Sequence, residues 1–216
     1  MSTTTLIPSP PLEAKKIQVY YQFHAKIYDM TRWLFLFGRH RLLDLLPFSA
    51  SDNPNIVEVG CGTGHNLLHL AHTYPNANIV GIDISADMLD EADRKLINTP
   101  QYIQLKQGVY GEKKFQLNRK AHCVLFSYCL TMVNPNWDKL IAQAKNDLSP
   151  EGYIAVVDFH RSSFKWFRKW MSYNHVRMEG HILPYLTQQF ETVQLEKRST
   201  YFGLWHYFLF IGKTKQ

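Results

Sequence analysis

Short apolar runs alternate with amphipathic stretches along most of the chain. The runs predict strands over 56–59, 78–83, 102–106, 123–127 and 153–158, with two final strands over 191–199 and 205–213 joined across 201–204. The amphipathic stretches predict helices over 66–73, from an N-cap at Ser85 to about residue 98, and over 137–148, before a turn at 149–152. Strands that alternate with helices indicate an α/β fold with a mostly parallel sheet.

The N-terminal part of the chain has a different pattern. Residues 1–12 are expected to form a loose tail, and residues from about 13 to 46 to be helical and very aromatic. With 216 residues, of which 45% are hydrophobic and 19% charged, the chain is long enough for one globular domain. No apolar run approaches the roughly 18 residues that a membrane span needs.

Charge and cysteine content narrow the class of protein. The net charge is +6, but residues 52–100 carry seven acidic residues and two basic ones, which is typical either of a polar or cationic ligand site or of a solvated acidic helix. The three cysteines form no C-x-x-C pair and the N-terminus has no secretory pattern, so we expect a reduced cytoplasmic protein without a metal centre.

The stretch from Glu58 to Gly64 carries the strongest chemical signal, because glycines spaced G-x-G-x-G follow a predicted strand directly. Glycine allows a tight turn in which backbone N–H groups approach a ligand closely. The spacing is not the dinucleotide fingerprint, and the Lys-Ser/Thr pair of a P-loop is missing. Asp83 ends the next strand, where a carboxylate can accept both hydroxyls of a ribose. These features favour a nucleoside-type cofactor over a purely structural turn.

Four segments resemble class I S-adenosylmethionine-dependent methyltransferases: VEVGCGTG at 57–64, GIDIS at 81–85 with Met88, LSPEGYIAVVD at 148–158, and WHYFLFIGKTK at 205–215. The resemblance implies a Rossmann-like, seven-stranded, mostly parallel sheet flanked by helices, with an antiparallel last strand, and S-adenosyl-L-methionine as cofactor. The residues it assigns to the cofactor are Tyr28, Glu58, Gly60, Cys61, Gly62, Thr63, Gly64, Asp83, Ile84, Met88, Ser127 and Tyr128. Many relatives have an acidic residue facing the adenine where Val109 stands, so adenine recognition stays open.

A narrower resemblance is to the betaine-lipid methyltransferases, which methylate the homoserine amine of diacylglyceryl-homoserine. It rests on residues 20–29 (YYQFHAKIYD), 31–33 and 35–39, and on residues 156–160, 166–168 and 174–181. It implies a tail and aromatic helical lid within residues 1–50, and a methyltransferase domain over 51–216 with a helical substrate-binding insertion at about 159–186. The His24–Asp29 piece also occurs in small-molecule and quinone methyltransferases.

The chemistry of an amine acceptor suggests further candidates. An amine must lose its proton before it takes a methyl group, and an imidazole can accept that proton near neutral pH. The catalytic candidates are His24, His160 and His175 for this proton, and Tyr21, whose aromatic face can stabilise the methylated cation. A structural role for each histidine, or proton loss to water, remains an alternative. Arg matches a carboxylate bidentately, so the candidate ligands of the headgroup are Arg32, Arg161, Arg177 and His181.

A helix predicted over 161–173 bears on partners. Arg161, Lys165, Arg168 and Lys169 are expected on one face and the aromatic residues on the other, a pattern typical of peripheral contact with an anionic membrane surface. The alternative is an ordinary amphipathic helix packed on its own domain. We expect no nucleic-acid partner, because residues 127–130 do not form the Asn/Asp-Pro-Pro-aromatic motif of amino-directed nucleic-acid methyltransferases.

The sequence therefore predicts an N-methyltransferase that acts on the amine of a lipid headgroup, in the cytoplasm or on the inner face of the membrane. The alternatives are a methyltransferase of a quinone precursor or other small molecule, a phosphatidylethanolamine N-methyltransferase, or a cofactor-binding protein without catalytic activity.

Overall fold

The computed structural model describes residues 35–112 and 117–215, and its strands and helices alternate along the chain. The strands are β1 (Asn55–Val59), β2 (Asn78–Asp83), β3 (Ile103–Gln107), β4 (Ala121–Ser127), β5 (Leu148–Arg161), β6 (Phe190–Thr200) and β7 (Trp205–Thr214). The helices are α2 (Arg39–Asp44), α3 (His65–Thr73), α4 (Ala86–Leu96), α5 (Trp137–Asp147), α6 (Lys165–Tyr173) and α7 (Ile182–Gln189), with the 3-10 turns η1 (Leu130–Met132) and η2 (Tyr201–Gly203).

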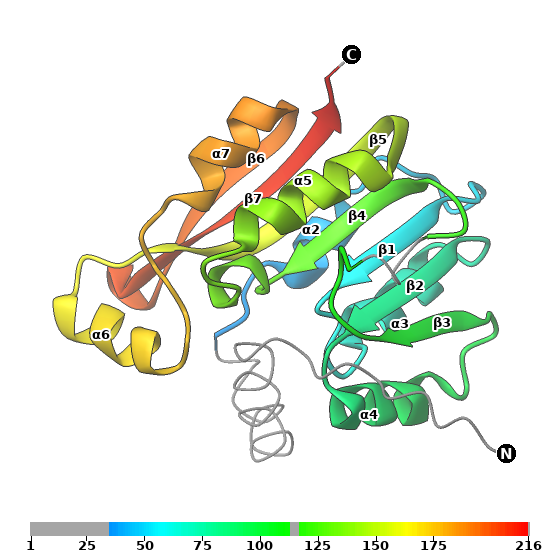
Figure 1. The fold of residues 1–216 in the computed structure, drawn as a ribbon, viewed down its shortest axis with the longest axis horizontal. Helices are drawn as coiled ribbons and strands as arrows, with labels where there is room; N and C mark the ends of the chain where they lie inside the picture. Colours follow the sequence, from blue (N-terminus) through cyan, green and yellow to red (C-terminus); the bar gives the residue numbers. More distant parts are fainter. Residues whose placement is uncertain (1–34, 113–116, 216) are drawn as a thin grey trace, which may run out of the picture.

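The strands form one sheet in the order β3-β2-β1-β4-β5-β7-β6 (Figure 1). Neighbouring strands from β3 to β5 are parallel, whereas β7 runs antiparallel to both β5 and β6. The expected Rossmann-like fold is confirmed, including the antiparallel last strand, the final hairpin, and the helices α6 and α7 between β5 and β6. The strand order reverses between β1 and β4, which is the point where open α/β sheets bind ligands.

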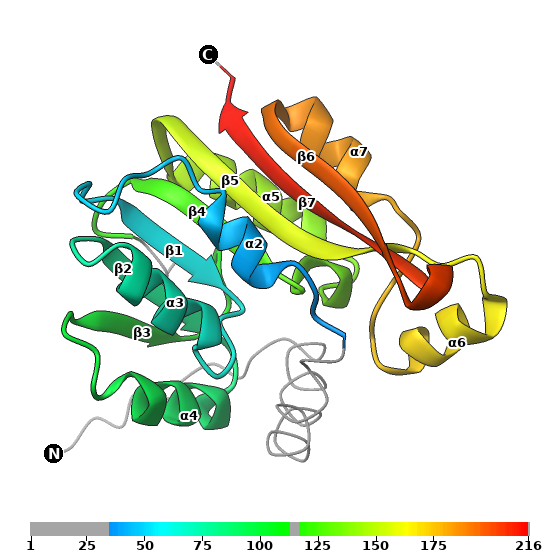
Figure 2. The same ribbon diagram turned by 180° about the vertical axis from the view of Figure 1, so that it is seen from behind.

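Alternating side chains along the strands build a core on each face of the sheet. In β4, Cys123 and Leu125 face the core that α2, α3 and α4 cover, while Val124 and Phe126 face the core that α5 and α7 cover. Figures 1 and 2 show these two helical layers from opposite sides. Because successive residues of a strand point to opposite faces, a sheet covered on both faces needs apolar residues at both sets of positions.

Two local differences from the prediction have backbone causes. Gly38 adopts a left-handed conformation with φ 80°, so α2 begins at Arg39 and the predicted helix does not run unbroken to residue 46. The predicted turn at 149–152 lies inside β5 as an irregularity, because the pairing with β4 shifts between Ala121 and Cys123 and Glu151 has φ 66°. The predicted lid and tail at residues 1–34 lie outside the described residues.

The region after β5 also differs from the prediction. Arg161 is the last residue of β5, and α6 begins only at Lys165, so the helix predicted over 161–173 is shorter at its N-terminal end.

Ser85 caps α4 as predicted, since its hydroxyl accepts from the Met88 N–H at 3.4 Å. Within the described ranges, no helix is both long and apolar enough to cross a membrane.

Candidate active site

The glycine-rich turn after β1 is fastened to the end of β2 by backbone hydrogen bonds. The N–H groups of Gly60 and Cys61 donate to the carbonyl of Ile82 at 2.8 and 3.1 Å. Gly60, Gly62 and Gly64 all have positive φ, at 73°, 52° and 75°, which residues with a Cβ rarely adopt. The turn therefore needs glycine at these positions, and it exposes backbone at the carboxyl edge of the sheet.

The carboxylate of Asp83 organises both loops around it. One oxygen accepts from the Gly62 N–H at 2.8 Å, and the other accepts from the Ser85 N–H at 3.0 Å. The side chain is only partly buried. A carboxylate oxygen has more than one lone pair, so Asp83 can still accept hydrogen bonds from a ligand.

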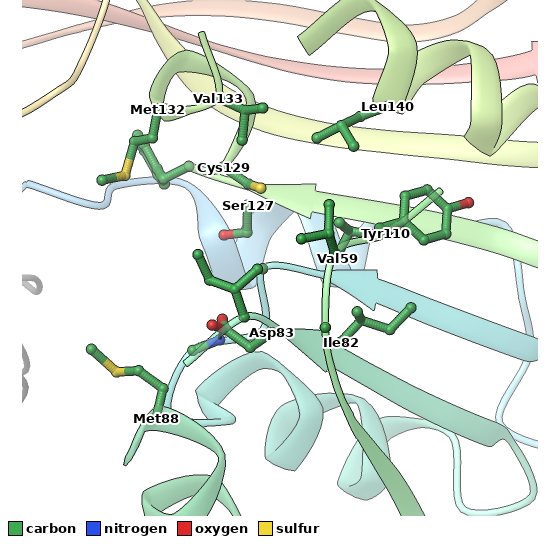
Figure 3. A pocket seen from close by; sticks show the side chains of 16 residues that line it. Val59, Ile82, Asp83, Met88, Tyr110, Ser127, Cys129, Met132, Val133 and Leu140 are labelled. Carbon is green, nitrogen blue, oxygen red and sulfur yellow. Dashed lines mark hydrogen bonds between the residues drawn. The ribbon is translucent and has the colours of Figure 1, made fainter. Parts of the chain in front are cut away.

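A cleft opens beside this carboxylate at the carboxyl ends of β1, β2 and β4 (Figure 3). It encloses about 790 Å³, including the part open to solvent. Asp83 and Met88 lie on one side, and Ser127, Cys129, Met132 and Val133 face them from the other. The lining residues are Val59, Gly60, Gly62, Ile82, Asp83, Ile84, Met88, Gly108, Val109, Tyr110, Ser127, Tyr128, Cys129, Met132, Val133 and Leu140.

The wall that follows β4 is held close to the glycine turn. Tyr128 has φ 53°, which bends the chain sharply after β4, and its hydroxyl donates to the Phe37 carbonyl at 2.7 Å. A Cβ on Gly60 would lie 2.8 Å from the Cys129 sulfur. The absence of a side chain at Gly60 therefore allows this wall to approach the turn.

Asp158 fixes the next part of the same wall. It is fully buried at the end of β5, and its two oxygens accept from the Thr131 hydroxyl at 2.5 Å and the Thr131 N–H at 3.1 Å. The Thr131 carbonyl in turn accepts from the Arg177 N–H at 2.9 Å. Asp158 thus joins η1, which carries Met132, to β5 and to the segment before α7. Burial raises the pKa of Asp158 to about 6, although the bonds from Thr131 oppose the shift.

Few charged side chains line the part of the cleft that the structure describes. Asp83 is the only charged side chain among the described lining residues. Burial raises the pKa of Tyr110, of Tyr128 and of the Cys129 thiol, so all three groups are protonated at neutral pH. Most of the remaining lining side chains are apolar, which favours a ligand with a large apolar surface.

The donors and acceptors of the cleft fit a nucleoside-type cofactor. Asp83 offers a carboxylate at the end of β2, as a ribose requires. The buried Ser127 hydroxyl lines the cleft and has no hydrogen-bond partner among the described residues. A buried hydroxyl without a partner costs free energy, which a ligand in the cleft can recover.

The structure brings together seven of the residues predicted to bind the cofactor: Gly60, Gly62, Asp83, Ile84, Met88, Ser127 and Tyr128 line the cleft. Four others lie beside it. Glu58 is buried and accepts from the Asn66 amide at 2.6 Å, Thr63 accepts from Lys95 at 3.2 Å, and Cys61 and Gly64 support the turn. The remaining candidates near the N-terminus, Tyr21, His24, Tyr28 and Arg32, lie outside the described residues.

The candidates for substrate chemistry at the end of β5 and beyond it are not among the residues that line this cleft. His160 is half-buried with its ring against Gly180, and His175 is exposed. Burial lowers the pKa of His160 and of His181, whose ring lies 4.8 Å from that of Trp137. Arg161 is exposed at the end of β5, and the exposed Arg177 guanidinium pairs with Glu179 at 2.9–3.2 Å.

Several lining residues were not predicted. Val109 was considered only as a departure from the family pattern, and the apolar wall from Cys129 to Val133 was missed together with Tyr110 and Leu140. Val59, Ile82 and Cys129, which were missed as well, lie at or just beyond strand ends, and this position is the signal that could have found them. Leu140 lies within α5 and has no such signal. The Asp158–Thr131 pair joins residues 27 positions apart, which no local pattern reveals.

Comparison with known proteins agrees with this geometry. A family profile described as a methyltransferase domain matches residues 56–152, which include the glycine turn, Asp83 and the wall after β4. Residues 56–152 are therefore similar to methyltransferase domains, on the part of the chain that forms the cleft. This similarity supports the expected class of enzyme and its expected cofactor, S-adenosylmethionine.

The curated relatives of this methyltransferase domain include two with different acceptors. The chain is 32% identical to malonyl-[acyl-carrier protein] O-methyltransferase of Acetivibrio thermocellus over 71% of this chain and 52% of the relative. It is 28% identical to demethylmenaquinone methyltransferase of Lactobacillus johnsonii over 73% of this chain and 64% of the relative. The chain spans little more than half of the first relative and just under two thirds of the second. Neither of them is named as a betaine-lipid enzyme.

Among solved structures, geranyl diphosphate C-methyltransferase of Streptomyces coelicolor has a TM-score of 0.73 with 12% sequence identity. The match covers 96% of this chain and 100% of the other. At this identity the likeness shows that the methyltransferase domain shares the fold, and it says nothing about the acceptor.

Replacing Asp83 tests the anchor of the cofactor site. Asp83→Ala removes the acceptor for two loop N–H groups and the predicted ribose ligand, so the affinity for S-adenosylhomocysteine should fall roughly tenfold to a hundredfold. Isothermal titration calorimetry measures the change. Asp83→Asn should lose less, and the exposed Asp87→Ala in the first turn of α4 should keep the affinity. Unchanged affinity in Asp83→Ala would contradict the assignment.

The buried Asp158 should make stability depend on pH. Its pKa is raised from 3.8 to about 6, so its contribution to stability is fully present below about pH 4 and is lost as the pH rises through 6. We expect the free energy of unfolding of the natural protein, relative to Asp158→Asn, to decrease between pH 4 and pH 7. Urea unfolding across this range measures the difference, and parallel pH profiles for the two proteins would refute the raised pKa.

Proposed function

We propose that this protein transfers a methyl group from S-adenosylmethionine to a small molecule whose acceptor atom is already nucleophilic at neutral pH. The observation that carries the proposal is the composition of the described cleft, where apolar side chains predominate and Asp83 is the only charged side chain. Such a wall suits an acceptor with an apolar body better than a strongly polar headgroup.

The cleft residues divide between cofactor and acceptor. Bound S-adenosylmethionine supplies an electrophilic methyl group on a sulfonium. In the proposal, Asp83 binds the ribose, the turn from Gly60 to Gly64 holds the methionine part with Glu58 behind it, and Ile84 and Met88 border the adenine. Val109 also lines the cleft, and an apolar side chain there favours adenine recognition by backbone groups. Cys129, Met132 and Val133 would exclude water and orient the acceptor.

The protonation states of the cleft argue for an acidic acceptor. Tyr110, Tyr128 and Cys129 are protonated, and Asp83 accepts hydrogen bonds from two backbone N–H groups. None of these described lining groups is therefore a suitable base at neutral pH. Carboxylates, enolates and acidic phenols need no base, and the names of two relatives refer to a malonyl group and a quinone.

Methylation of a lipid amine is the second candidate. It needs a base and, for a homoserine headgroup, a cation that pairs with the carboxylate. His160, His175, Arg161, Arg177 and His181 do not line the described cleft. Arg177 already pairs with Glu179. Tyr21, His24 and Arg32 would have to supply these functions, and the same need for a base applies to phosphatidylethanolamine.

We also propose that the protein works in the cytoplasm and meets its acceptor at the inner surface of a membrane. Exposed aromatic and basic side chains on α6 support this location. An amphiphilic acceptor, such as a quinone precursor, would partition into the same surface.

A methyl-transfer assay with an acceptor panel tests the proposal. The full chain is incubated with radiolabelled S-adenosylmethionine and, separately, a malonyl thioester, a series of naphthols of decreasing pKa, diacylglyceryl-homoserine and phosphatidylethanolamine. We expect label in the carboxylate or the naphthols, with kcat/KM at neutral pH rising as the acceptor becomes more acidic. Label in the amine lipids alone would replace the proposal by the second candidate. Cofactor binding without transfer to any acceptor would favour a non-catalytic role.

A further inference from the structure

Large aromatic side chains are exposed at one end of the molecule, on α6 and at the tip of the β6–β7 hairpin. Trp166 is 63% exposed, Tyr173 is 72% exposed, and Trp170 is also exposed. At the hairpin tip, Phe202 is fully exposed. Monomeric proteins seldom leave several large aromatic residues exposed next to one another, so such a group indicates an interaction surface.

The two elements lie side by side at this end in both views (Figures 1 and 2). Phe167 on the inner side of α6 stacks on the buried Trp205 at the start of β7, with ring centroids 5.3 Å apart and planes within 10°. The Ser162 hydroxyl donates to the Leu204 carbonyl at 2.5 Å. The exposed aromatic residues therefore stand on a shared, packed base.

The backbone of the hairpin tip keeps Phe202 out of the core. Tyr201 and Phe202 have φ of 44° and 55°, although both are bulky residues for which the left-handed conformation is unfavourable. Such strain is typical of residues that serve a function beyond stability. Glycine or asparagine would adopt this conformation at lower cost, so stability alone does not account for Phe202.

Basic residues share the exposed side of α6 with the aromatic ones. Lys165 and Lys169 are exposed one turn apart, next to the stripe formed by Trp166, Trp170 and Tyr173, while Phe167 and Met171 point inward. Of the side predicted to be aromatic, only Phe167 and Met171 are buried, and Trp166, Trp170 and Tyr173 stay exposed beside the basic side. Residues 161–178 carry five Lys or Arg and no Asp or Glu.

We propose that Lys165, Trp166, Lys169, Trp170, Tyr173 and Phe202 form an aromatic–basic surface that binds the surface of an anionic phospholipid bilayer. Aromatic side chains favour the headgroup region of a bilayer, and lysines beside them are attracted to anionic lipids. Charge complementarity favours this partner over a second copy of the chain, whose own corresponding surface is equally basic. The inference rests on the proposed membrane location and not on methyl transfer itself.

Cosedimentation with vesicles tests the proposal without measuring activity. The full chain is mixed with vesicles of phosphatidylcholine alone or of equal parts phosphatidylcholine and phosphatidylglycerol. We expect binding to the anionic vesicles only, weakened by salt because the attraction is screened. Transfer activity measured in parallel, with a water-soluble acceptor, separates a failure of this proposal from a failure of the proposed reaction.

Paired variants locate the binding surface. Phe202→Asn should weaken binding about fivefold or more, while the fold is kept because Asn tolerates the left-handed conformation. The double variant Lys165→Glu/Lys169→Glu should weaken it at least roughly tenfold, because each basic residue near an anionic surface contributes about fivefold. The matched controls are Tyr102→Asn, which removes another exposed aromatic residue, and Arg119→Glu/Lys139→Glu, which reverses two exposed charges elsewhere.

Three outcomes would overturn the proposal. Equal binding to neutral and anionic vesicles would remove the role of the lysines, and equal losses in the variants and their controls would remove the surface. If the natural protein bound neither vesicle, the aromatic–basic surface would be covered by another part of the chain or by a second copy of it. Light scattering identifies the second copy as a dimer that Phe202→Asn dissociates.

Discussion

The hydrogen bonds that the Asp83 carboxylate accepts from Gly62 and Ser85 hold the candidate active site together. They join the turn after β1 to the start of α4, at the side of the sheet where the strand order reverses. Without this acceptor, two loop N–H groups beside the cleft would lose their partner, and the wall from Cys129 to Val133 would face a less defined surface. The carboxylate is thus both a structural centre of the cleft and a predicted ligand of the cofactor.

Much of this arrangement could be predicted from the sequence, because its signals are local. The alternation of apolar runs predicted the seven strands that the structure describes, with Ser85 as the cap of α4. The glycine spacing and the position of Asp83 predicted a cofactor site at the edge of the sheet where the structure has a cleft. These features depend on residues close together in the chain, for which periodicity and turn chemistry suffice.

The remainder depends on contacts between distant residues. Thr131 and Asp158 meet because β5 lies beside β4, and Phe167 meets Trp205 because α6 folds back on the start of β7. Which aromatic residues of α6 are buried could not be predicted for the same reason, since the inward side of a helix is set by the surface it packs against. The acceptor was the least predictable feature. The motifs predicted to bind the cofactor say little about the wall from Cys129 to Val133 on the other side of the cleft. The protonated and apolar groups of that wall favour an acidic small molecule over a lipid amine as the proposed acceptor.

A crystal structure of the full chain with S-adenosylhomocysteine tests the central claim most directly, which is that the cleft beside Asp83 holds the cofactor. We expect the ribose hydroxyls to bind the Asp83 carboxylate, the adenine to lie between Met88 and Val109, and the sulfur to face the Cys129–Val133 wall. Density for the ligand elsewhere, or in this cleft without contact to Asp83, would contradict the account.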